Sequence, residues 1–124
     1  MHFLSEVRKH AGFMVPGPAQ VAAVAALEDQ GHVDAQRDRY YGRLSRLAAV
    51  LTELGLDVSL PGGGFYLWVP APGGDAWALA ELLARKVGAI VSPGEFYGDS
   101  APGYVRVAAV QPDERLELLA ARIA

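Results

Sequence analysis

A change of hydrophobic period near Gly55 is the feature that most constrains the fold of this 124-residue chain. From His32 to about Leu54, apolar residues recur at steps of three and four, which predicts one long amphipathic helix. Its apolar positions are Tyr40, Leu44, Leu47, Leu51 and Leu54. Beyond Gly55, the segments Leu56–Leu60 and Phe65–Val69 are predicted as strands, because one alternates and the other is rich in aromatic and β-branched residues. The chain therefore has to combine a long helix with short strands.

Further helices are predicted on both sides of these strands. The first dozen residues predict a short helix that Gly12 ends, and an Ala-rich helix follows from Ala19 to about Asp29. Asp75 is placed to cap a later helix, and Pro112 opens the last one. The core faces predicted for these two helices are Leu79, Leu82, Leu83 and Val87, and Leu116, Leu119, Ala120 and Ile123.

Two more strands complete the expected fold. Ala89–Val91 is short and apolar, and Tyr104–Ala108 is an apolar strand that carries one charge. The order of elements predicts a small α+β domain, in which a few strands are covered on one side by helices.

Composition narrows the possible functions. The net charge is −3 and the basic residues form no uninterrupted run, so no nucleic-acid partner is expected. No segment approaches the ~20 apolar residues that span a bilayer, so no membrane partner is expected and a cytoplasmic location is the default. The chain has no cysteine, and its three histidines lack metal-ligand spacing, so no metal site is expected.

Arg106 is the sharpest candidate for chemistry. Its planar fork of donors matches a carboxylate in two parallel hydrogen bonds, and it sits on a strand just after the loop Ser92–Gly98. Gly94 in that loop allows the backbone to pack closely around a ligand, and Phe96 and Tyr97 can wall a pocket. The alternatives are that Arg106 lies on an ordinary solvent-facing strand and that the two aromatic residues close the edge of the core.

No catalytic residue is predicted within the chain. A lysine that forms a Schiff base should be desolvated or lie beside another cation, and nothing indicates burial of Lys9 or Lys86. The three glycines of Gly62–Gly64 lead into a strand and not into a helix, so they predict a turn and not a phosphate loop.

Four segments together make the chain resemble the class I/II aminotransferases that depend on pyridoxal phosphate. They are Val15–Gln20, Gly63–Trp68, Ser92–Gly98 and Tyr104–Val107, in the same order as in that family. The resemblance implies the small, C-terminal domain of such an enzyme, with a mainly antiparallel sheet. It also implies that Arg106 binds the α-carboxylate of the substrate, with Gly94 and Phe96 beside it.

Within the family, Arg8–Met14 and Val110–Arg115 are most similar to succinyldiaminopimelate aminotransferase. That similarity implies transfer of an amino group between glutamate and an N-succinyl keto acid on the route to lysine. The family's cofactor lysine lies in a Ser-x-x-Lys motif, which this chain lacks. The resemblance therefore implies that residues 1–17 end an interdomain helix and connector and that residues 18–124 are the small domain.

The implied partners are the amino-acid or keto-acid substrate, the large domain of the same enzyme and, in the complete enzyme, a second subunit. The cofactor binds outside this chain on that interpretation, and the isolated chain is expected to be inactive. Two alternatives stay open: a stand-alone binding or self-association module that keeps the fold, and an unrelated α+β domain that binds small acids through Arg106.

Overall fold

The computed structural model describes residues 1–12 and 14–123, so Phe13 of the predicted motif Arg8–Met14 and Ala124 of the predicted domain lie outside the described residues. The chain divides into two compact units, residues 1–35 and 36–124. The first holds α1 (His2–His10), α2 (Gly17–Glu28) and the start of α3 (Gln30–Glu53). Neither α1 nor α2 has a buried residue.

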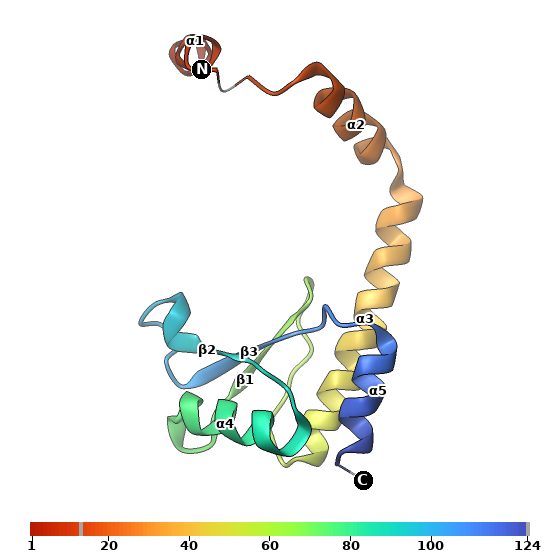
Figure 1. The fold of residues 1–124 in the computed structure, drawn as a ribbon, viewed down its shortest axis with the longest axis vertical. Helices are drawn as coiled ribbons and strands as arrows, with labels where there is room; N and C mark the ends of the chain where they lie inside the picture. The colour runs from red at the N-terminus through yellow and green to blue at the C-terminus, as the bar shows by residue number, and fades with distance from the viewer. Residues whose placement is uncertain (13, 124) are drawn as a thin grey trace. The chain divides into compact units, whose positions relative to one another are not determined.

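The second unit contains the sheet and the core. After α3 come β1 (Tyr66–Pro70), the short helix η1 (Pro72–Gly74), α4 (Ala76–Val87), β2 (Ser92–Pro93), the short helix η2 (Gly94–Tyr97), β3 (Tyr104–Ala108) and α5 (Asp113–Ala121). The strand order is β1-β3-β2, and both pairs are antiparallel. This arrangement confirms the predicted α+β class with a small antiparallel sheet (Figure 1).

One face of the sheet forms the core. Leu67, Val69 and Val105 are completely buried, and they alternate with residues of the opposite, more exposed face. They pack with apolar residues of α3, α4 and α5, among them Leu44, Leu47, Leu51, Leu79, Leu83, Val87 and Leu116. The sheet therefore has an inner face that packs on the core and an outer face that does not.

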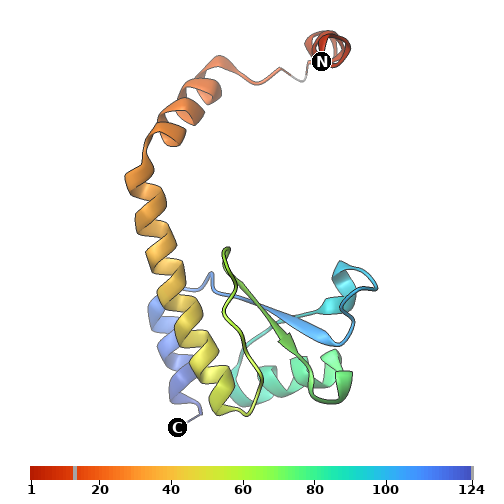
Figure 2. The same cartoon turned by 180° about the vertical axis from the view of Figure 1, so that it is seen from behind.

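Side-chain capping and an ion pair fix the helices around this core. The Asp75 side chain accepts a hydrogen bond of 2.9 Å from the Ala78 amide, as predicted, and Gly88 ends α4 at φ 71°. Helix α5 runs beside α3 in both views (Figures 1 and 2), and Arg43 of α3 donates a 2.8 Å hydrogen bond to Asp113 at the start of α5. The Arg43 guanidinium lowers the pKa of the Asp113 carboxyl below its usual range.

Several sequence-based boundaries were wrong. Residues 56–60 form no strand, and the third strand is Ser92–Pro93 rather than Ala89–Val91. Leu82, predicted to face the core, is 42% exposed, while Ala76 takes a core position in the first turn of α4. Ala120 of α5 is also exposed. Among the described helices, none combines the length and the apolar character needed to cross a membrane.

Candidate functional site

Arg106 lies on the outer face of the central strand. It stands directly opposite Trp68 of β1 and Ser92 of β2, so all three residues share the face that does not pack on the core. Its neighbours in the strand, Val105 and Val107, are buried on the other face. The alternation of the strand therefore presents the guanidinium on the open side of the sheet.

Two tyrosine rings cover the guanidinium. The Arg106 Cζ atom is 4.3 Å from the centroid of the Tyr66 ring and 4.5 Å from that of Tyr97. Both distances are well within the ~6 Å range of a cation–π contact. Tyr66 comes from β1 and Tyr97 from η2, so the arginine joins the sheet to the loop that precedes its own strand.

The donors of Arg106 differ in their surroundings. Its Nε is buried and has no hydrogen-bond partner among residues 1–12 and 14–123. The two terminal nitrogens are not buried, and neither makes a hydrogen bond within that part of the chain. They remain as the donors that a ligand carboxylate can reach.

Arg106 also has no acidic neighbour within ion-pair distance in the described part of the chain. Two arginines on the helices differ in this respect: Arg43 pairs with Asp113 at 2.8 Å, and Arg85 pairs with Glu81 at 2.6 Å. A half-buried cation without a counter-ion favours binding of an anion, because the protein itself does not neutralise it.

Gly94 sets the path of the loop Ser92–Gly98. It is buried, and a Cβ atom at this position would lie 1.9 Å from the carbonyl oxygen of Ala101 and 2.9 Å from that of Tyr104. Only a residue without a side chain allows η2 to approach the start of β3 so closely. The close approach brings η2, and with it Tyr97, over the outer face of the sheet.

Phe96 lies elsewhere in the same loop. It is 63% exposed, and its ring meets Trp77 of α4 edge to face at a centroid distance of 5.6 Å. The Trp77 indole N–H also donates a hydrogen bond to the Glu95 carboxylate, which ties the loop to α4. The structure thus brings Tyr97 of this loop to Arg106 and Phe96 to α4, while Gly94 packs against the start of β3. The binding roles of Gly94, Phe96 and Arg106 stay predictions.

Sequence reasoning singled out the loop but missed Tyr66 and Trp68. Tyr66 covers one face of Arg106, and the Trp68 ring stands edge-on to Tyr97 at 5.6 Å. The signal for both was the alternation of Phe65–Val69, which puts residues 66 and 68 on one face. Pairing with Tyr104–Ala108 in this register was needed to bring that face to Arg106.

The two lysines are not arranged for covalent chemistry. Lys9 is exposed and lies 4.0 Å from Glu6, and Lys86 is exposed in the last turn of α4. Neither is desolvated, so neither fits the Schiff-base anchor of pyridoxal phosphate. In the part of the chain that the structure describes, no cluster of three or more metal-ligating side chains occurs either.

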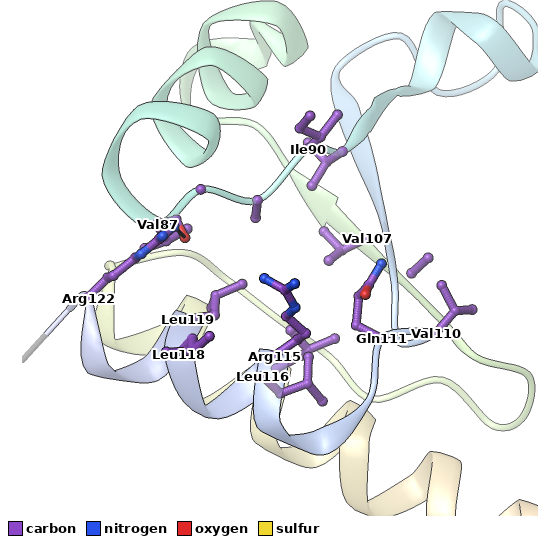
Figure 3. A pocket seen from close by; sticks show the side chains of 15 residues that line it. Val87, Ile90, Val107, Val110, Gln111, Arg115, Leu116, Leu118, Leu119 and Arg122 are labelled. Carbon is purple, nitrogen blue, oxygen red and sulfur yellow. Dashed lines mark hydrogen bonds between the residues drawn. The ribbon is translucent and has the colours of Figure 1, made fainter.

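A separate cavity of about 410 Å³ lies between α5 and the segment that leads into β2. Arg115 extends into it from α5, beside Val107 and Leu116 (Figure 3). Arg122 also lines it and donates a 2.8 Å hydrogen bond to the Val87 carbonyl. This cavity is distinct from the arginine site, because its lining includes none of Arg106, Gly94 and Phe96.

The amino-acid sequence of the chain is similar to those of known aminotransferases. Residues 3–123 match the family model described as aminotransferase class I and II. The 4-dedimethylamino-4-oxo-anhydrotetracycline transaminase OxyQ of Streptomyces rimosus is 46% identical over 120 residues, which are 97% of this chain and 33% of that protein. An LL-diaminopimelate aminotransferase of Dehalococcoides mccartyi is 38% identical over 112 residues, covering 89% of this chain and 29% of the relative.

Solved structures agree with the sequence matches. The crystal structure of an aminotransferase from Neisseria meningitidis superposes with a TM-score of 0.80 at 33% identity, over 94% of this chain and 31% of that one. The chain thus spans about a third of the length of the relatives that it matches.

Proposed function

The chain belongs to the class I and II aminotransferases, and on that basis we propose that it serves as the small domain of a pyridoxal-phosphate-dependent transaminase. In this proposal residues 1–17 end the interdomain helix and connector, and residues 18–124 form the small domain. The described elements from α3 onward supply the core and the sheet on which the arginine stands.

The observation that carries the proposal is the state of Arg106. It is a half-buried cation in contact with two rings, with accessible terminal nitrogens and no acidic partner in the described residues. We propose that it binds the α-carboxylate of an amino acid or keto acid through two parallel hydrogen bonds. Gly94 shapes the neighbouring loop, and Phe96 lines the approach on the side of α4.

Pyridoxal phosphate supplies the electron sink for transamination. The two lysines described above do not fit its anchor, so in our proposal a large domain of the same enzyme carries the cofactor. The part played by this chain is to capture and orient the substrate. The complete enzyme would act as a homodimer in the cytoplasm.

For the substrate, we propose an N-succinyl-diaminopimelate-type keto acid with glutamate as the amino donor. The similarity of Arg8–Met14 and Val110–Arg115 to succinyldiaminopimelate aminotransferase supports this choice. The LL-diaminopimelate aminotransferase of Dehalococcoides mccartyi among the relatives supports a diaminopimelate substrate more broadly.

The test is the Arg106→Lys substitution in the full-length protein that carries this chain. Lysine keeps the charge but offers no planar fork, and hydrogen bonds to charged groups contribute about 1.5–3 kcal/mol, so KM for glutamate should rise about ten- to a hundredfold. Steady-state kinetics measure this rise. Arg115→Lys is the matched control, because Arg115 lines the separate cavity. An unchanged KM in Arg106→Lys would show that the carboxylate binds elsewhere.

A second candidate is a non-catalytic binding or self-association module. It is favoured by exposed apolar residues on α1 and α2, among which Phe3 is 76% and Leu27 is 85% exposed. Transaminase activity of the full-length protein with glutamate separates the two functions. Activity supports the enzyme, and concentration-dependent self-association without activity supports the module.

A further inference from the structure

Arg106 lies at the centre of a continuous row of aromatic rings, of which Tyr66, Trp68 and Tyr104 share its face of the sheet. On one side, Tyr97 meets Trp68 edge-on at 5.6 Å, and Trp68 meets Tyr104 at 6.5 Å. On the other side, Tyr66 lies 4.4 Å from Phe65, which lies 5.4 Å from Tyr40 of α3. Each tyrosine that contacts the guanidinium therefore also packs against a second aromatic ring.

This row restricts the side chain of Arg106. A free arginine has many rotamers, and their loss upon binding weakens the capture of a ligand. Here the rings of Tyr66 and Tyr97, at 4.3 and 4.5 Å, set the position of the guanidinium. The Nε atom of Arg106 is buried and has no hydrogen-bond partner in the described residues, so no hydrogen bond from Nε holds the side chain in place. Ring contact is thus the interaction that fixes the arginine.

We propose that Tyr66 and Tyr97 are positioning residues that hold the Arg106 guanidinium between their rings before a carboxylate arrives. A carboxylate then approaches in the plane of the guanidinium and meets the terminal nitrogens. Because the rings act by contact, the phenol hydroxyl groups are dispensable. The inference rests on the proposed role of Arg106 as the carboxylate site.

The contact between Tyr97 and Arg106 depends on the conformation of the loop Ser92–Gly98. Tyr97 belongs to η2, whose close approach to β3 depends on Gly94, whereas Tyr66 belongs to the sheet. One half of the ring pair is therefore part of a loop and the other half is part of the sheet. Tyr97 is the better residue to test, because it is 44% exposed and its replacement disturbs little of the core.

The experiment measures binding of maleate, a planar dicarboxylate that cannot be transaminated, to the full-length protein by calorimetry. Tyr97→Leu should raise the dissociation constant about tenfold, which lies between the values for an exposed and a desolvated cation–π contact. Tyr97→Phe should restore most of that loss, because the ring returns without the hydroxyl. Tyr41→Leu is the matched control, since Tyr41 is a 61% exposed tyrosine on α3 and is absent from the row.

The outcomes separate this inference from the proposed function. Loss of maleate binding in Arg106→Lys with none in Tyr97→Leu leaves the carboxylate site intact and overturns the positioning role. Binding that survives Arg106→Lys overturns the site itself. An equal loss in Tyr97→Phe and Tyr97→Leu also overturns the inference, because the hydroxyl and not the ring would then act.

A second readout needs no ligand and covers a Tyr97→Leu variant that folds poorly. Nuclear magnetic resonance of arginine side chains reports rotation of the guanidinium about the Nε–Cζ bond. In the unliganded protein, rotation in Arg106 should be slower than in the exposed Arg39 of α3, and it should remain slow in Tyr97→Phe. Rotation in Arg106 as fast as in Arg39 would contradict the proposal.

Discussion

Gly94 is the residue on which the geometry of the arginine site depends most, because the space for a Cβ atom is taken by two carbonyl oxygens. Gly94→Ala should displace η2 and cost about 1–3 kcal/mol of stability, the usual range for overpacking. Maleate binding should weaken as well, because Tyr97 moves with the loop. Chemical denaturation and calorimetry measure the two effects.

Gly62→Ala is the control for this substitution, since nothing lies within 4 Å of a Cβ atom at Gly62. If Gly94→Ala were as stable as Gly62→Ala and bound maleate normally, the loop would not depend on the close approach.

At the same scale, the sequence singled out Arg106 in an apolar strand and Gly94 in a Pro-Gly turn from their type and their neighbours. Their binding roles stay predictions. Tyr66 and Trp68 were not singled out, since an aromatic residue in a strand is equally typical of a core. Only the register that pairs Trp68 with Arg106 shows which face these rings occupy, and one sequence does not contain that register.

At the scale of the elements, the ion pair between Arg43 of α3 and Asp113 of α5 should make the stability of the fold depend on pH. The Arg43 guanidinium lowers the pKa of Asp113 from its ordinary value of 3.8. A carboxyl with a lowered pKa stabilises the fold above the unfolded-state value, and this stabilisation is lost as the pH falls through the folded-state value. Asp113→Asn should therefore lower the unfolding midpoint near neutral pH, and its difference from the parent protein should vanish well below pH 3.8.

Thermal unfolding across this pH range provides the measurement, with Asp57→Asn as the exposed control. A difference between Asp113→Asn and the parent that persisted at the acidic end would mean that the charge of Asp113 is not the cause.

Helices were predicted better than strands, and packing explains why. Asp75 and Gly88 mark the two ends of α4 through local hydrogen bonds and backbone geometry, which depend on neighbouring residues alone. Residues 56–60 alternate like a strand but find no partner strand, and Leu56 is simply buried as part of the core. A strand needs a partner, and the sequence does not say which segment supplies it.

For the whole molecule, every buried apolar residue among those described lies at position 44 or later. A chain that begins at Gln36 should therefore keep its cooperative unfolding. Its midpoint should change by less than about 4 °C, the shift that ~1 kcal/mol produces in a small domain. Differential scanning calorimetry of the two chain lengths measures this. Loss of the transition in the shorter chain would mean that residues 1–35 contribute to the core.

The alternation along β3 has a consequence for how such a domain can evolve. Val105 and Val107 face the packed side, while Tyr104 and Arg106 face the open side, although the four residues are adjacent in the chain. Natural selection for a stable fold therefore acts on one set of codons. On the proposed role of Arg106, selection for ligand preference acts on the codons between them, so a lineage can change what it binds by substitution at alternate positions while the interior is inherited unaltered.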